Sequence, residues 1–132
     1  MGELRMSEGT LGDSKLIDTH GRAHRDLRVS LTDRCSLRCT YCMPADFAQW
    51  IPSAELLTTD ELMTVLRVAI EEGIDEVRLT GGEPLLRPDA VDVVHRINSL
   101  PKPPRVSITT NGLRLAAQAG ALRDAGLERV NV

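Results

Sequence analysis

The residues most suited to chemistry are three cysteines in the stretch "CSLRCTYC", residues 35–42, which are the only cysteines of the chain. The neighbouring Arg34 and Arg38 favour thiolates, the form that binds metals. Three cysteines cannot pair completely as disulfides, and they are one ligand short of a structural zinc site. A four-iron cluster fits this number, because Cys35, Cys39 and Cys42 would hold three irons and leave the fourth open to a small molecule.

The spacing of the cysteines also leaves open zinc binding and inert burial. A zinc site could take its fourth ligand from His20 or His24, although structural zinc sites are usually built from paired knuckles. Inert, buried cysteines are common in proteins, but a polar loop that contains Asp33 and two arginines disfavours three of them together. The pattern therefore favours a cluster over zinc and over inert thiols.

The cysteines must be positioned by the elements around them, and four short β-branched runs predict the strands. Each run has the length and composition of a strand, and the runs lie at residues 27–31, 75–80, 105–110 and 127–132. The cysteines follow the first of these runs directly. Sites of parallel α/β proteins are built from the loops at the carboxyl ends of the strands, so this position favours a functional role.

Helices are predicted between the strands. The first begins at Thr58, which has capping-box spacing to Glu61, and it ends at Gly73. Pro88 opens the second, and the third covers about 115–125. The first helix is expected to bury one apolar stripe formed by Leu62, Val65, Leu66 and Ala69.

This alternation of strands and helices predicts an α/β fold, a partial parallel (β/α) barrel. Residues 1–17 are polar and Gly-rich, so we expect a flexible N-terminal tail, with the ordered domain at 18–132. A closed eight-stranded barrel takes about 250 residues. We therefore expect this chain to be the N-terminal part of a longer domain, truncated after about four strands.

The ends of the second and third strands also carry ligand-type residues. "LTGGEP", residues 79–84, has glycines that permit close backbone approach, and "TTNG", residues 109–112, places Thr109 and Asn111 where a strand opens into a loop. Each stretch taken alone could be an ordinary turn. Three consecutive strand ends with such residues indicate one shared site.

Two arginines interrupt otherwise apolar strands. Alternation places Arg28 and Arg78 on the sheet face opposite Val29 and Val77, which would be the interior of a barrel. A salt bridge or an exposed face would account for either arginine alone. Two of them directed at one cavity favour an anionic substrate, because the planar guanidinium suits phosphate or a purine edge.

Composition restricts the partners. The 132 residues have a net charge of −3 with acids and bases interspersed, so no broad basic face is expected and nucleic acid is excluded as a partner. The sequence has neither a secretory apolar segment nor eighteen consecutive apolar residues, which indicates a cytoplasmic protein without a membrane partner.

"CSLRCTYC" and "GGEP" together resemble the motifs of the radical S-adenosylmethionine (SAM) superfamily. The resemblance implies that Cys35, Cys39 and Cys42 ligate a 4Fe-4S cluster whose open iron is chelated by SAM. Gly82 and Glu83 would then meet the methionine end of SAM, and Tyr41 would meet the adenine. Transfer of an electron from an external donor would split SAM and produce a 5'-deoxyadenosyl radical.

A closer resemblance extends from residue 18 to residue 132 through "DTHGRAHRDLRVSLTDRCSLRCTYCMP", "VRLTGGEPLLR" and "TTNG". These stretches are similar to the N-terminal part of the GTP cyclases of molybdenum cofactor biosynthesis, which form 3',8-cyclo-7,8-dihydro-GTP. Arg28, Arg78 and Thr109 would contact GTP, and the radical would remove the ribose 3' hydrogen. Members of this family hold a second, C-terminal 4Fe-4S cluster whose cysteines are absent here, so we expect this segment alone to be inactive.

Two rival functions remain open. The sequence does not show whether the protein is a monomer or a homodimer, and it does not identify the electron donor. One rival is a different radical SAM activity, such as peptide modification. The other is a noncatalytic metal-binding module, which would lose zinc and unfold when its cysteines are replaced.

Overall fold

The computed structural model describes residues 15–37, 39, 44, 46 and 49–132. Their centre is a four-stranded parallel sheet in which the strands follow one another in chain order. The strands are β1 (Asp26–Ser30), β2 (Glu76–Thr80), β3 (Arg105–Thr109) and β4 (Arg129–Asn131). The bounds of each strand agree with those of a predicted run to within two residues, so the predicted strands and their parallel arrangement are confirmed.

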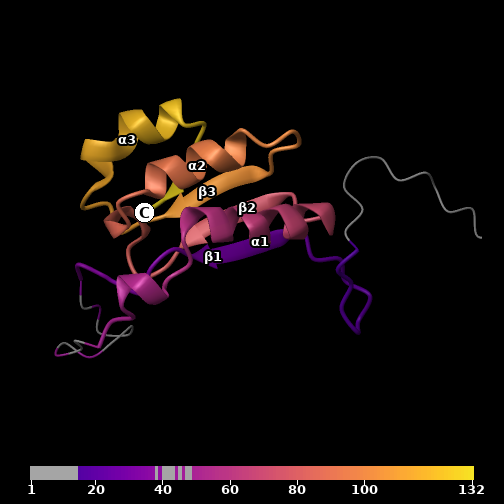
Figure 1. The fold of residues 1–132 in the computed structure, drawn as a ribbon, viewed down its shortest axis with the longest axis horizontal. Coiled ribbons are helices and arrows are strands. Elements are labelled where there is room, and N and C mark those ends of the chain that lie inside the picture. The colour runs from indigo at the N-terminus through magenta and orange to yellow at the C-terminus, as the bar shows by residue number, and fades with distance from the viewer. Residues whose placement is uncertain (1–14, 38, 40–43, 45, 47–48) are drawn as a thin grey trace, which may run out of the picture.

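Three α-helices connect the strands and lie on one face of the sheet (Figure 1). They are α1 (Thr59–Glu71), α2 (Ala90–Asn98) and α3 (Leu115–Asp124), and the short 3-10 turns η1 (Ser53–Glu55) and η2 (Pro84–Leu86) precede the first two. Adjacent parallel strands need such crossover helices, because a hairpin turn can join only antiparallel strands. The α/β class and the partial parallel barrel are therefore confirmed.

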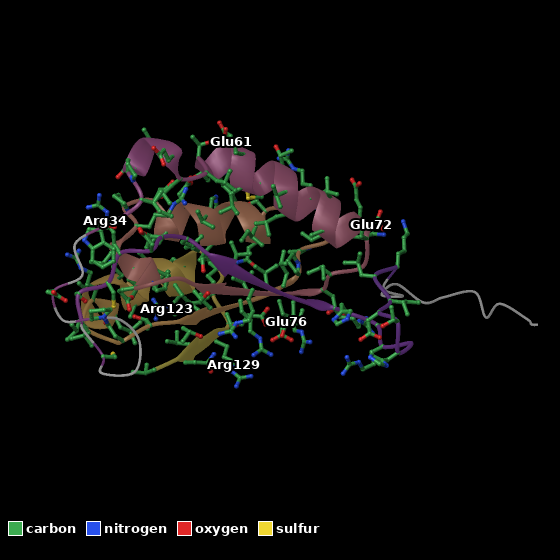
Figure 2. The ribbon with its side chains drawn as sticks, turned by 90° about the horizontal axis from the view of Figure 1, so that it is seen from below. Arg34, Glu61, Glu72, Glu76, Arg123 and Arg129 are labelled. Carbon is green, nitrogen blue, oxygen red and sulfur yellow. The ribbon has the colours of Figure 1, made fainter. Side chains whose placement is uncertain are left out.

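The core lies between the sheet and these helices. Strand residues Val77, Leu79 and Ile108 are fully buried in it, as are Leu66 of α1 and Val94 of α2. Alternating positions on the same strands project from the opposite face, which none of the three helices covers. Figure 2 shows Glu76 and Arg129 on that second face, on the far side of the sheet from α1. Alternation thus gives one apolar and one polar face.

The predicted start of helix α1 is confirmed, but the predicted apolar stripe of this helix is wrong at one position. The Glu61 amide donates to Thr58 Oγ1 at 3.2 Å and the Thr58 amide donates to Glu61 Oε2 at 2.8 Å, which completes a capping box. Val65, however, is 52% exposed, and Met63 is buried in its place. The packed face of α1 therefore lies on the Met63 side of Leu62 and Leu66, because the helix is oriented by its contact with the sheet and α2.

The start of the second helix also differs from the prediction. Helix α2 begins at Ala90, whereas Pro88 lies in a turn between η2 and the helix. The Asp89 side chain, in the N-cap position, makes no cap hydrogen bond to α2. It instead accepts from Arg87 and from Thr59, so it connects the start of α2 to the start of α1.

The N-terminal boundary is described only in part, since residues 1–14 lie outside the described residues. The Lys15 amide donates to the carbonyl of Glu72 at 2.9 Å, and Ile17 forms an isolated bridge with Ala23. Residues 15–17 therefore join the fold, and the flexible tail stays a prediction for the residues before them. Among the described helices none is long and apolar enough to cross a membrane.

Candidate functional site

The loops after β1, β2 and β3 meet at the carboxyl end of the sheet. The pairing with β2 continues beyond the end of β1, because the Leu31 amide donates to the Thr80 carbonyl at 3.0 Å. Figure 2 shows Arg34 at this end of the molecule and Glu72 at the opposite end. The three stretches that the sequence motifs select are thus brought together at one edge.

The glycines after β2 are needed for contact with the chain itself. The Gly82 amide donates to the Thr32 carbonyl at 2.8 Å, and the Glu83 amide donates to the Arg34 carbonyl at 2.7 Å. A Cβ on Gly81 would lie 2.4 Å from the Thr32 oxygen, and one on Gly82 would lie 2.2 Å from the Arg34 oxygen. These distances exclude any side chain, so both glycines allow the cysteine loop to lie directly against the end of β2.

Glu83 is the most deeply buried charged residue of the site, with 1% exposure. Its Oε1 accepts from the Thr110 hydroxyl at 2.6 Å and from the Leu85 amide at 3.1 Å, and its Oε2 accepts from the Asn111 amide at 2.7 Å. A buried carboxylate is tolerated only when donors of this kind satisfy it. In this geometry the Glu83 side chain binds the end of β3 to the loop after β2.

A further hydrogen bond joins the third stretch to the first. Asn111 Nδ2 donates to the hydroxyl of Ser36 at 3.1 Å, and Ser36 is the residue after Cys35. Asn111 therefore connects Glu83 to the cysteine loop. Thr110 completes this turn, because its hydroxyl also accepts from the Gly112 amide at 3.1 Å.

Two of the three cysteines are described. Cys35 and Cys39 are both half-buried in the loop after β1. Cys42 and Tyr41, the other predicted ligand and the predicted adenine contact, lie outside the described residues. The loop also contains Asp33, whose Oδ2 accepts from the Ile51 amide at 2.7 Å and so joins the beginning of the loop to its return.

The predicted substrate residues share the open, polar face of the sheet. Arg28 and Arg78 are register partners on β1 and β2, opposite in direction to Val29 and Val77 as alternation predicted. Thr109 ends β3 and has the orientation of Ser107, the register partner of Arg78. Arg28, Arg78 and Thr109 are all exposed on this face.

The two arginines differ in their partners. Arg78 Nη2 lies 2.7 Å from Asp26 Oδ2, and its Nε lies 3.5 Å from Glu76 Oε1. Arg28 has no ion pair among the residues that the structure describes. The Arg28 guanidinium is therefore the more available of the two to an incoming anion. To bind an anion, the Arg78 guanidinium would have to release or share its ion pairs with Asp26 and Glu76.

Three residues that help to assemble the site, Ser36, Thr110 and Arg87, lie within the quoted stretches, but the sequence reasoning gave them no role. Arg87 lies next to the site and is bound to Asp89. Burial opposes ionisation of Asp89, but hydrogen bonds from Arg87 and Thr59 outweigh it and hold the pKa of this carboxyl below its usual value. A strand alternation or helix pattern gives no signal for such contacts, because the residues come from segments far apart in the sequence.

Comparison with known proteins agrees with this geometry. Residues 29–132 match the radical SAM superfamily. The chain belongs to the radical SAM superfamily. As predicted for this superfamily, the cysteine loop and the GGE stretch adjoin each other at the carboxyl end of the sheet.

Among radical SAM proteins the chain is similar to a GTP 3',8-cyclase of Streptomyces coelicolor, with 55% identity over 130 residues. A GTP 3',8-cyclase of Mycolicibacterium smegmatis is 53% identical over 121 residues, and human molybdenum cofactor biosynthesis protein 1 is 49% identical over 117 residues. The alignments cover 98%, 91% and 89% of this chain. The chain spans only 38%, 34% and 18% of the length of these relatives.

Membership of the radical SAM superfamily implies a 4Fe-4S cluster and SAM, and the chemistry of the described cysteines fits the cluster. The glycine pair brings the backbone of the cysteine loop against the end of β2, which leaves no room for a side chain between them. Three thiolates are the donors that such a cluster uses. Cys35 and Cys39 are therefore suitable ligands at the edge where Gly82 and Glu83 lie.

Proposed function

We propose that the protein containing this chain is a GTP 3',8-cyclase that acts in molybdenum cofactor biosynthesis. The observation that carries the proposal is the joint placement of three predicted GTP contacts, Arg28, Arg78 and Thr109, on one open face of the sheet whose first strand leads into the cysteine loop. The similarity to relatives named GTP 3',8-cyclase supports the same substrate.

Each site residue has a proposed role that follows from its position. Cys35, Cys39 and Cys42 hold the cluster, and when bound the cluster and SAM supply the radical that starts the reaction. Gly82 lets the cysteine loop lie against the end of β2, where its backbone would meet the methionine end of SAM, and Tyr41 contacts the adenine. The Glu83 carboxylate is occupied by three protein donors, so it contributes to SAM binding by fixing the loop that carries Gly82.

The arginines would bind GTP through charge-assisted hydrogen bonds, which are stronger than bonds between neutral groups. Arg28 offers an exposed guanidinium, and Thr109 offers a hydroxyl nearer the carboxyl end of the same face. The remaining contacts to SAM and GTP, and the second C-terminal cluster, belong to parts of the protein beyond this chain. An external electron donor and a cytoplasmic location complete the proposal.

The test is anaerobic iron and sulfide reconstitution of the full-length protein, followed by incubation with GTP, SAM and a reductant. Formation of 3',8-cyclo-7,8-dihydro-GTP is expected, and replacement of all three cysteines by serine should abolish it together with the visible absorbance of the cluster. Residues 1–132 alone should give no product. Stoichiometric binding of zinc in place of iron, or SAM cleavage that GTP does not stimulate, would overturn the proposal.

A further inference from the structure

The guanidinium of Arg87 joins the two ends of the loop that carries the cysteines. Its Nη1 donates to the carbonyl of Leu31, the residue after β1, at 3.1 Å. Its Nη2 donates to the carbonyl of Leu57, just before α1, at 2.9 Å. Residues 32–56 between these carbonyls include all three cysteines. One side chain thus sets the separation of the points where the loop leaves and re-enters the fold.

The charge of Arg87 is held in a fixed orientation. The side chain is only 10% exposed, and its Nε lies 2.7 Å from Asp89 Oδ1. Asp89 Oδ2 accepts from the hydroxyl of Thr59, the first residue of α1. A buried guanidinium must be paired, and this carboxylate both pairs it and connects it to the start of α1.

The geometry requires arginine at this position. Its hydrogen bonds use three different nitrogen atoms of one planar group, directed at two carbonyls and one carboxylate. A lysine ammonium is a compact charge on a flexible stem, so it can replace some of these bonds but cannot hold all three acceptors in the same plane. These hydrogen bonds are all to the chain's own loop ends and to Asp89, and none is to a residue proposed to meet SAM or GTP.

We propose that Arg87 is a positioning residue that fixes both ends of the cysteine loop and thereby the presentation of Cys35, Cys39 and Cys42 to the cluster. Removal of the guanidinium leaves the Leu31 and Leu57 carbonyls and the Asp89 carboxylate without this donor. The loop ends then separate more readily, and the loop samples conformations in which the three thiolates do not converge. This inference rests on the proposed cluster, but not on GTP as the substrate.

The chain offers a matched control. Arg96 of α2 pairs with Asp60 of α1 at 2.7 Å, so Arg96→Gln removes the same charge from a contact between two helices without touching the loop. Arg87→Gln, Arg87→Lys and Arg96→Gln are compared with the unmodified full-length protein after anaerobic reconstitution. Three properties are measured: the rate at which the visible absorbance of the cluster is lost in the presence of an iron chelator, the rate of amide hydrogen exchange, and the changes in kcat and in the KM for SAM.

For Arg87→Gln we expect iron loss to accelerate by about tenfold, which corresponds to the loss of about one hydrogen bond from a charged donor. Amide exchange should accelerate in residues 31–37 and 56–59 and stay unchanged in β2 and β3, and kcat should fall more than the KM for SAM rises. Arg87→Lys should lie between Arg87→Gln and the unmodified protein, and Arg96→Gln should match the unmodified protein.

Equal iron loss in Arg87→Gln and Arg96→Gln would overturn the inference. So would uniform acceleration of exchange through β2 and β3, because it would mean that Arg87 serves only global stability. If the unmodified protein holds the cluster but does not convert GTP, the proposed function fails while the iron-loss comparison still decides the role of Arg87. If it holds no cluster, the proposed function and this inference both fail.

Discussion

The two ends of the sheet are built by different means. At the carboxyl end the backbone of the cysteine loop lies directly on Gly81 and Gly82, and the carboxylate of Glu83 is buried among three donors. At the amino end Arg25 and Asp75 form an ion pair of 2.6 Å with side chains that are 49% and 40% exposed. A hollow of about 710 Å³ there is lined in part by Ile70, Ile74, Leu100 and Pro104.

This difference indicates that residues at the carboxyl end must keep one precise geometry, whereas residues at the amino end contribute only to the stability of the fold. Close backbone contacts and buried hydrogen bonds tolerate little displacement, since either a clash or an unsatisfied donor results. Exposed ion pairs are screened and contribute little. The same contrast between a site-bearing and a stabilising end is general for parallel β/α barrels. Four substitutions test it, from the largest expected effect to the smallest.

Gly82→Ala should give the largest effect. The new Cβ would lie 2.2 Å from the Arg34 carbonyl oxygen, so the cysteine loop must move, with a loss of about 3 kcal/mol in the free energy of unfolding. The control is Gly120→Ala on the exposed side of α3, where nothing lies within 4 Å and alanine should stabilise by about 0.5–1 kcal/mol. Urea denaturation measures both, and equal effects of the two substitutions would contradict the contrast.

Glu83→Gln should destabilise the protein by about 2 kcal/mol, because a neutral amide cannot accept from the Thr110 hydroxyl and from both backbone amides as the carboxylate does. Cluster content should fall as well, since Asn111 connects Glu83 to Ser36 in the cysteine loop. The exposed Glu128 provides the control Glu128→Gln, which should leave both quantities unchanged. Urea denaturation measures the stability, and iron analysis measures the cluster content. Equal effects of Glu83→Gln and Glu128→Gln would rule out a role of Glu83 in holding the cysteine loop.

The contribution of Asp89 to the free energy of unfolding should depend on pH. Its pKa is below the usual value in the folded protein because Arg87 and Thr59 outweigh the effect of burial, so its stabilising contribution is present above its unfolded pKa of about 4. This contribution is lost as the pH falls through the folded pKa. The difference in unfolding free energy between the unmodified protein and Asp89→Asn should be constant from about pH 7 to 5 and shrink below about pH 4. A difference that is independent of pH would contradict it.

The smallest effect is expected at the amino end, for Arg25→Gln. The ion pair with Asp75 is half exposed, so its loss should cost about 0–1 kcal/mol, and cluster content and turnover should not change. Thermal unfolding and iron analysis would measure this. A loss comparable to that of Glu83→Gln would show that the two ends of the sheet are not as different as their contacts indicate.

Much of this arrangement could be predicted from local sequence. The strand runs, the capping box of Thr58 and Glu61 and the spacing of the cysteines depend on residues close together in the chain, and the structure confirms the strands and the cap. The orientation of Arg28 and Arg78 followed from alternation alone. Local pattern failed where packing decided, as at Val65, which helical spacing placed in the core and which is exposed.

The sequence by itself determined which residues could do chemistry and the order of elements that would carry them, because side-chain types and short-range periodicities are directly visible in it. Only the tertiary structure decided that the Arg34 carbonyl packs against Gly82 and that the Glu83 carboxylate accepts hydrogen bonds from Thr110 and Asn111. It also decided that Arg87 donates hydrogen bonds to both ends of the cysteine loop. These contacts join segments distant in sequence, and they form only once parallel strands bring the ends of β1, β2 and β3 to one edge.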